Sequence, residues 1–320
     1  MISFIAQSIR MSAAFLFGST GEIITEKAGH LNLGIPGVMC MGAIGGAIGA
    51  RLYVSSLADL SQISAFPAFV IPLLFCLIFA SLMGILYSFL TVSLRANQNI
   101  TGLAISTFGA GFATFVNNII PKDGFKEIGY VYFKLFPSTE KLGGFGELFL
   151  SYGAMVYLAI IIAIAAALVL KKTRTGLHLR AVGESPATAD ATGINITGYR
   201  YTATIVGSAI AGMGGLFYFF DMNGGSWPYS DAISALGWLS IAIVIFSIWR
   251  PDLCILSSII FGLLYRLQYF MASATLSQKT LIGMLPYVIT ILVLIVTSIV
   301  GSKKAQPPAS LGLNYFREER

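Results

Sequence analysis

The stretch Leu60–Leu94, LSQISAFPAFVIPLLFCLIFASLMGILYSFLTVSL, contains no Asp, Glu, Lys or Arg. A helix needs roughly 20 such residues to cross about 30 Å of hydrocarbon, and this stretch is longer. It lacks the strict alternation of apolar and polar residues that a strand of a membrane β-barrel shows. Because lipid offers no hydrogen-bond partner to a backbone N–H or C=O, the stretch predicts a membrane-spanning α-helix.

The same absence of charge recurs along the chain. Six further stretches lack all four charged residue types: Ala28–Ala50, Ala96–Pro121, Leu148–Leu170, Tyr201–Phe220, Ala232–Trp249 and Thr280–Ser302. Apolar residues make up 56% of the chain and charged residues 11%, whereas a soluble domain carries about 25% charged residues. We therefore predict an all-α membrane protein, a polytopic bundle of about eight or nine transmembrane helices.

The predicted spans follow from these stretches. They are Ile2–Gly21, Gly34–Val54, Phe66–Leu94, Gln98–Ile120, Ser151–Leu170, Tyr201–Phe220, Ala232–Trp249, Leu253–Ala272 and Leu281–Val300. The first is left open between a span and an interfacial helix, because Arg10 interrupts it. One transmembrane domain is expected over residues 1–302, with a cytoplasmic loop at about 172–199. Residues 303–320 are expected to be a poorly ordered cytoplasmic tail.

Basic residues near the span ends predict the orientation, because Lys and Arg favour the cytoplasmic side. With nine spans, one side collects Arg95, Lys171–Arg200, Arg250 and Lys303–Lys304. We take that side as cytoplasmic, which places the N-terminus outside. The loop Pro121–Glu147 then faces outward, although it carries four lysines: Lys122, Lys126, Lys134 and Lys141.

Small residues recur at helical spacing within the predicted spans. The pairs and the triplet are Gly42 with Gly46, Gly45 with Gly49, and Gly207 with Ala211 and Gly215. Such patterns let helix backbones approach closely in lipid. They indicate static packing or a moving helix interface, and static packing is the interpretation we favour.

The cytoplasmic loop predicts a short helix of its own. Ser185 is suited to the N-cap, Pro186 to the first helical position and Gly193 to the C-terminal stop. Ala187, Ala189 and Ala191 would present small surfaces to a partner, so that Ala189→Trp would report on docking alone. The segment is either a handle for a soluble protein or a solvated connector.

Polar residues in apolar surroundings are the candidates for a solute path. Gly29–Gly37 is either a broken helix lining a cavity or an ordinary turn, with Asn32 as its preferred polar candidate. Asn97, Gln98 and Thr101 form either a capping cluster or a gate at the start of a span. Asn117 and Asn118 lie near the far end of that span, where amides must be paired or face water.

Five sequence blocks carry a family resemblance, in family order. They are Gly21–Gly37 (GEIITEKAGHLNLGIPG), Asn97–Ala104 (NQNITGLA), Gly176–Ile194 (GLHLRAVGESPATADATGI), Gly237–Ala242 (GWLSIA) and Met284–Tyr287 (MLPY). They resemble blocks in the permease subunits of ATP-binding-cassette (ABC) importers related to the ribose and branched-chain amino acid permeases. The subgroup that the chain looks most like serves nucleoside uptake. The chain departs from the family pattern at two positions. Pro36 stands where the family usually has an acidic residue, and Ser247 stands where it usually has glycine. These departures leave the local helix geometry at both positions open.

The resemblance implies partners and a mechanism. It implies separate ABC ATPase subunits, a second homologous permease, an extracellular or periplasmic solute-binding (lipo)protein, and a multi-pass location in the cell membrane. The cytoplasmic helix would then be a coupling helix that docks on the ATPase and drives alternating access. Its expected coupling residues are Arg180, Gly183, Glu184, Ser185, Pro186, Ala189 and Gly193. The solute would be small and neutral, most simply a nucleoside.

What the sequence lacks narrows the function. It has no G-x-x-x-x-G-K-[ST] phosphate loop, so the chain is not expected to hydrolyse ATP or to be an enzyme. The sequence indicates neither a cofactor nor a metal, and the net charge of +6 reads as membrane topology, not nucleic-acid binding. No paired carboxylates are expected in the apolar core, which disfavours a proton-coupled carrier. The alternatives are a sugar or amino acid permease in the same machinery, or a self-sufficient secondary carrier or channel.

Overall fold

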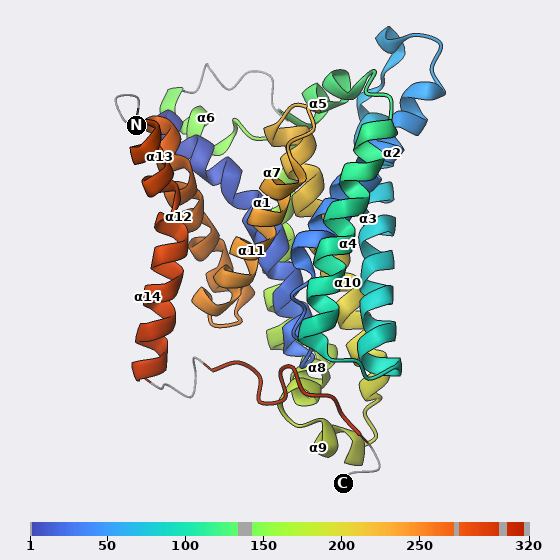
Figure 1. The fold of residues 1–320 in the computed structure, drawn as a ribbon, viewed down its shortest axis with the longest axis vertical. Coiled ribbons are helices and arrows are strands. Elements are labelled where there is room, and N and C mark those ends of the chain that lie inside the picture. Colours follow the sequence, from blue (N-terminus) through green and yellow to red (C-terminus); the bar gives the residue numbers. More distant parts are fainter. Residues whose placement is uncertain (1, 134–142, 272–274, 301–305, 317–320) are drawn as a thin grey trace.

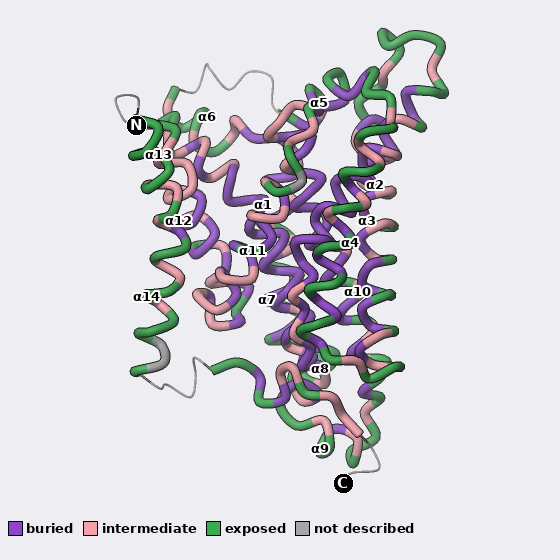
Figure 2. Tube along the Cα trace, in the orientation of Figure 1, coloured by how far each residue is buried: buried purple, intermediate pink, exposed green. Residues whose placement is uncertain are grey.

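The computed structural model describes residues 2–133, 143–271, 275–300 and 306–316. Helices dominate these residues and no strand occurs among them, which confirms the predicted all-α bundle. Its centre is α1 (Ile2–Lys27), which runs obliquely through the molecule (Figure 1). From Met11 to Ile23 every residue of α1 is buried, and the tube in Figure 2 is purple there.

One side of the bundle consists of four helices. Three are α2 (Ile35–Ser55), α3 (Ala65–Ser88) and α4 (Gln98–Ile119), and the fourth, α10 (Ile196–Phe217), packs against α2 and α3. Two of these helices end in a wider π-helical turn, η2 (Phe89–Ser93) after α3 and η4 (Tyr218–Met222) after α10.

The remaining long helices complete the bundle. They are α7 (Ala154–Lys172), α11 (Ser230–Phe246), α12 (Pro251–Phe270) and α14 (Leu285–Val300), with the short α13 (Leu276–Gly283) before α14. α7, α11 and α12 pack against α1, whereas α14 contacts α11 and α12. Nearly all described side chains of α14 are exposed or half-buried (Figure 2).

Short helices lie at the two ends of the bundle (Figure 1). One end carries η1 (Leu60–Gln62), α5 (Phe125–Phe133) and α6 (Gly143–Phe149), together with the start of the chain. The other end carries α8 (Arg174–Glu184) and α9 (Pro186–Ala191). We call these the outer end and the inner end.

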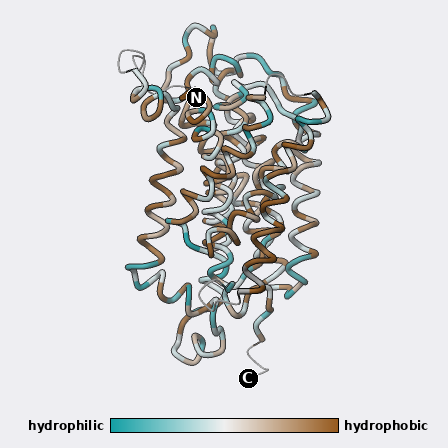
Figure 3. Tube along the Cα trace, turned by 90° about the vertical axis from the view of Figure 1, so that its left-hand side faces the viewer, coloured by the Kyte–Doolittle hydropathy of each residue, from teal (hydrophilic) through white to brown (hydrophobic). Residues whose placement is uncertain are grey.

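Within the described parts of the chain, seven helical segments are long and apolar enough to cross a membrane: Ile35–Ser55, Ala65–Ser93, Gln98–Ile119, Ala154–Lys172, Ile196–Met222, Pro251–Phe270 and Leu276–Val296. Hydrophobic residues dominate this middle zone and hydrophilic ones gather toward the two ends (Figure 3). The charged α1 and the shorter α11 run through the same bundle, which agrees with the nine-span path predicted for the chain. For the first segment, the burial of α1 at the centre of the bundle favours a span over an interfacial helix.

Two expectations need correction. The tail was expected to be poorly ordered, but residues 306–316 fold back onto the inner end and make defined hydrogen bonds there. The loop at about 172–199 holds two helices and not one, since α8 precedes the predicted α9. Lys134, Lys141 and Lys303–Lys304, which the orientation argument used, lie outside the described residues.

The small-residue patterns are helix contacts, as predicted. A Cβ added at Gly42 would overlap the backbone of Gly212 on α10, and one at Gly45 would come within 2.9 Å of the Phe75 carbonyl oxygen on α3. At Gly215 it would overlap Met39 on α2. Glycine therefore sets how closely α2, α3 and α10 approach one another.

Candidate functional site

The inner end presents α9 as the sequence predicts. Ser185 occupies the N-cap position and Pro186 the first turn, although the Ser185 hydroxyl bonds to the hydroxyl of Thr188 (2.8 Å) and not to the backbone. Gly193 ends the helix at a positive φ of 84° and donates its N–H to Asp190 O (2.9 Å). Glycine fits this stop because it adopts the left-handed region without strain.

The predicted coupling residues face in different directions. Arg180, Glu184, Ser185 and Gly193 are exposed, and Pro186 is half-buried. Gly183 is buried, and a Cβ there would overlap the backbone carbonyl of Lys27 at the end of α1.

Ala189 is buried as well, at 3% exposure, within a small cluster formed with Val182 and Ile196 of this same chain. The expectation that Ala189→Trp reports on docking alone is therefore wrong. A tryptophan there would displace α9 from its own support. Ala187 and Ala191 are the exposed alanines of this helix.

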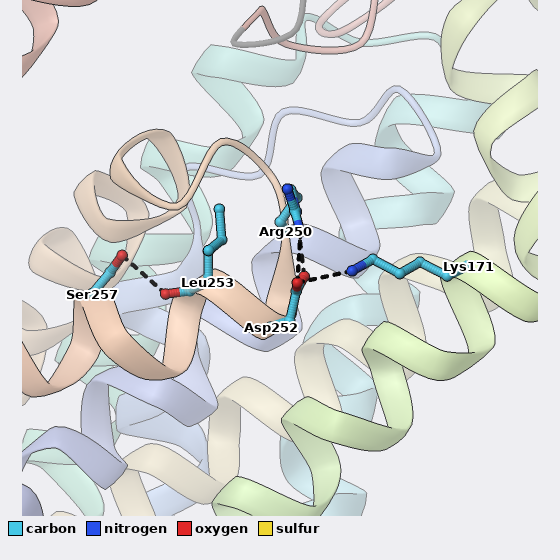
Figure 4. A network of polar contacts seen from close by, with 5 residues as sticks. All are labelled: Lys171, Arg250, Asp252, Leu253 and Ser257. Atoms are coloured by element: carbon cyan, nitrogen blue, oxygen red, sulfur yellow. Dashed lines mark hydrogen bonds and ion pairs between the residues drawn. The ribbon is translucent and has the colours of Figure 1, made fainter.

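An ion-pair cluster joins the α11–α12 turn to the inner end of α7. Asp252 Oδ2 lies 2.8 Å from Lys171 Nζ and 2.7 Å from Arg250 Nη2 (Figure 4). One turn further along α12, the Ser257 hydroxyl donates to Leu253 O (3.1 Å). The charged side chains are substantially exposed, so water and salt screen these pairs and they add little to the stability of the fold. The cluster marks the place where α7 meets the α11–α12 turn, and we assign it no catalytic or binding role.

Two buried carboxylates lie just inside that junction. Glu22 and Glu26, one helical turn apart on α1, are 0% and 3% exposed. Glu22 Oε1 accepts the backbone N–H of Asn32 (3.0 Å), and Glu26 Oε2 accepts the indole N–H of Trp249. The prediction that the core holds no paired carboxylates is wrong, because α1 continues six residues past the predicted end of the first span.

The turn between α1 and α2 is built on these carboxylates. Asn32 is fully buried, and its Oδ1 accepts the N–H of Gly34 (2.9 Å), which closes the turn ahead of Pro36 in the first turn of α2. Gln98 Oε1 accepts the N–H of Leu31 (2.9 Å). Gly29–Gly37 therefore forms a turn between α1 and α2, and Asn32 bonds to the backbone within it.

The other inner path candidates also contact the protein. Asn97 caps α4, because its Oδ1 accepts the N–H of Ile100 (3.1 Å), so the capping alternative is confirmed for this residue. Gln98 and Thr101 are buried at 2% and 6% exposure. The structure brings Asn32 and Gln98 to the same turn, where each binds its backbone.

Asn117 and Asn118 lie at the opposite end of α4, about 30 Å away for a helix of its length. They line a cavity of about 620 Å³ at the outer end of the bundle, which we call the outer cavity. Its other lining residues are Thr114, Lys122, Trp227, Pro228, Tyr229 and Asp231. The path candidates thus divide into a packed inner group and an open outer group.

A second feature of the outer end escaped the sequence reasoning. Arg10 Nε on α1 lies 2.5 Å from Asp221 Oδ1 on η4, and the Asp221 side chain is fully buried. The Arg10 guanidinium also lies 4.0 Å from the ring centre of Phe133 on α5. The position of Arg10 inside a predicted span could have indicated this pair, because a basic residue within a membrane bundle usually pairs with another group inside it.

A family model described as "Branched-chain amino acid transport system / permease component" matches residues 4–294. The nucleoside ABC transporter permease protein NupC of Lactococcus lactis is 30% identical over 325 residues, covering 98% of this chain and 97% of that protein. The guanosine ABC transporter permease protein NupQ of Bacillus subtilis is 28% identical over 320 residues, covering 97% and 95%. A Haloferax volcanii permease assigned to glucose, TsgC13, is 28% identical over 281 residues, covering 84% and 78%.

A solved structure has a related fold. It is an inward-facing conformation of a protein assigned as a metal-chelate type ABC transporter, with a TM-score of 0.50 and 14% sequence identity over 93% of this chain and 84% of that one. At that identity the similarity concerns the arrangement of helices and not the solute.

Proposed function

This chain belongs to the permease family of branched-chain amino acid transport systems, and we propose that it carries nucleosides across the cell membrane as the permease of an ABC importer. It is a multi-pass membrane protein of an ABC transporter, which the family and the apolar helices together establish. The nucleoside assignment is carried by two full-length relatives, one named for nucleosides and one for guanosine.

The outer cavity has chemistry suited to this solute. Trp227 and Tyr229 offer aromatic faces on which a base can stack. Asn117, Asn118 and Asp231 offer amide and carboxylate groups that can bind ribose hydroxyls. A cavity of about 620 Å³ is within the usual range for small-molecule sites.

The inner end suits a motor protein. The exposed residues of α8 and α9 project from the bundle where a soluble ATPase could bind them. The absence of a phosphate loop supports a separate subunit as the site of ATP hydrolysis. In this proposal the ATPases move α9, and the bundle alternates between openings at its outer and inner ends.

The exposed helices suit further partners. α4 exposes Thr107, Gly111 and Asn118 along one face, and α14 exposes most of its described length. We propose that a second permease subunit covers part of these faces and shares the path, and that a solute-binding protein delivers nucleosides to the outer end.

A sugar is the second candidate solute, favoured by the relative assigned to glucose. Ribose hydroxyls and glucose hydroxyls would bind the same amides, and the aromatic faces also suit a sugar ring. The nucleobase is the group that a nucleoside has and glucose lacks, so recognition of the base would distinguish the two solutes.

The test is uptake of labelled uridine, adenosine, guanosine and glucose by cells that carry or lack the gene. Loss of nucleoside uptake on deletion, restored by the wild-type gene, is the expected result. Restoration by Asn118→Leu is expected to be poor, and restoration by Leu82→Ala, an exposed side chain of α3 outside the cavity lining, is expected to be full. Unchanged nucleoside uptake with lost glucose uptake would assign the permease to the sugar.

A further inference from the structure

The last described segment of the chain, residues 306–316, crosses the inner end of the bundle; we call it the C-terminal strap (Figure 1, red). It contains a compact turn, in which Leu311 donates its N–H to Pro308 O (3.0 Å) and Leu313 donates to Ser310 O (3.1 Å). Pro308 and Ser310 are buried. The strap is therefore seated on the protein as a folded segment.

The strap first binds the end of α8. Ser310 donates both its N–H (3.0 Å) and its hydroxyl (2.5 Å) to Gly183 O. Ala309 N–H lies 3.3 Å from Glu184 Oε2. Gly183 and Glu184 both belong to the predicted coupling residues, so the strap contacts the segment on which an ATPase would act.

It also binds α9 and the start of α10. The Tyr315 hydroxyl donates to Asp190 Oδ2 (2.9 Å), and the Tyr315 ring packs on the cluster that buries Ala189. The Arg200 guanidinium donates to Leu313 O (3.3 Å). α9 has only six residues, which makes each such contact a large share of its support.

The strap then reaches the inner ends of the membrane helices. Gly312 donates its N–H to Gly29 O (3.2 Å) in the α1–α2 turn. Asn314 Nδ2 donates to Arg95 O (2.9 Å) in the α3–α4 turn, and Asn314 Oδ1 accepts from Gln98 Nε2 at the start of α4 (3.3 Å). One short segment thus joins the two coupling helices to the ends of α1, α3 and α4.

We propose that the C-terminal strap is a positioning element that transmits the movement of α8 and α9 to the inner ends of α3 and α4. This rests on the proposed function, in which ATPases act on α9. Among the larger contacts in the described chain, α9 touches only α8 and α10, and neither of these has a comparable contact with α4. The strap supplies the direct connection between α9 and α4, from Tyr315 to Asn314.

The experiment uses the complete importer with a double variant, Asn314→Ala/Tyr315→Phe, which removes the side-chain bonds to the α3–α4 turn, α4 and α9. Leu313→Ala is the matched control, because the Leu313 side chain is 60% exposed and its bonding group is the backbone carbonyl. Uptake and ATP hydrolysis are measured together in proteoliposomes, with membrane level and ATPase co-purification as further readouts. A stop codon at Gln306 provides a second variant that removes the whole strap.

The double variant is expected to keep its membrane level, ATPase co-purification and ATP hydrolysis, while solute uptake per ATP falls by about tenfold. Leu313→Ala is expected to match the wild type. An unchanged uptake per ATP in the double variant and in the truncated chain would overturn the proposal. So would a joint fall in membrane level, co-purification and uptake, because that pattern means that the strap only holds the fold together. The ratio is measured with whichever solute the wild type carries, so a wild type that carries glucose overturns the nucleoside assignment and leaves the strap testable.

Discussion

Trp249 links a strained turn to a buried charge. Ile248 and Trp249 both have positive φ, 54° and 51°, which costs on the order of 1–3 kcal/mol per residue. The Trp249 indole donates to Glu26, and the ion pairs of Arg250 and Asp252 flank the turn. Ser247, where the resembling family has glycine, has a φ of −84° and needs no glycine. Side-chain contacts therefore maintain a backbone shape that the local sequence does not favour.

Trp249→Phe is expected to lower the free energy of unfolding by about 1–3 kcal/mol, because it leaves a buried Glu26 oxygen without its donor. Thermal unfolding of the detergent-solubilised protein measures the change. Combining the substitution with Glu26→Gln is expected to give less than the sum of the two single effects, as directly bonded groups do. Strict additivity would mean that the two side chains act independently.

His30 predicts a pH dependence of stability. Burial, followed by the nearby Arg200 charge, lowers the pKa of His30 to about 3. An unfolded histidine has a pKa of about 6.5, so between these values the unfolded chain binds a proton that the folded chain does not. The His30 contribution to the free energy of unfolding is therefore expected to fall as the pH drops from about 6.5 toward 3, by up to ~1.4 kcal/mol per pH unit.

The comparison is between the wild type and His30→Asn, with unfolding followed across that pH range. The variant is expected to show a shallower decline, whatever its stability at neutral pH. Parallel pH profiles would show that His30 titrates normally in the folded protein.

At the scale of single helices, glycine contacts set the spacing. Gly42 lies against the backbone of Gly212, whereas nothing lies within 4 Å of a Cβ added at Gly111 on the exposed face of α4. Gly42→Ala is expected to destabilise the protein by about 1–3 kcal/mol through overpacking. Gly111→Ala is expected to be neutral or slightly stabilising, because alanine is the better helix former. Unfolding temperatures measure both, and equal shifts would contradict the close contact of α2 with α10.

The α9 helix offers a second matched pair. Ala187 is exposed and Ala189 is buried, although both lie on the same short helix. If α9 docks on an ATPase, Ala187→Trp is expected to keep its membrane level and lose ATPase co-purification. Ala189→Trp is expected to lower the membrane level itself. Normal co-purification and uptake with Ala187→Trp would make α9 a connector.

The whole molecule is organised around α1, which carries Arg10 near the outer end and Glu22 with Glu26 near the inner end. Both ends are bonded to distant segments, Arg10 to Asp221 on η4 and Glu26 to Trp249 on the α11–α12 turn. A buried ionisable group destabilises the fold when its bonded partner is lost. These contacts attach the central helix α1 to other segments at both ends of the bundle.

At this scale the energy source can be tested. The purified chain alone is expected to show no ATP hydrolysis, because its sequence has no phosphate loop. Liposomes that contain only this chain are expected to take up no solute. Adding the ATPases, the second permease subunit and a loaded solute-binding protein is expected to produce both activities. Solute uptake by the chain alone would contradict a role that depends on partner subunits.

The sequence by itself determined the membrane class, the positions of most spans, the short helix at Ser185–Gly193 and the close helix contacts at glycine. These follow from local properties, because the length of an uncharged stretch, a cap residue or a missing side chain acts within one helix or one contact. Sequence blocks also predicted the permease family, which the family model then confirmed.

Tertiary structure decided what depends on contacts between distant segments. Glu22 and Glu26 lie beyond the predicted end of the first span, but α1 continues to Lys27 and buries them, and Asn32 and Trp249 donate hydrogen bonds to them. The tail was expected to be poorly ordered because it is a chain end. In the structure its polar groups are bonded by six other segments: α8, α9, α10, α4, the α1–α2 turn and the α3–α4 turn. Asn32 and Gln98 resembled path residues because an isolated amide in an apolar stretch lacks a partner, and only folding brings the backbone that each one binds.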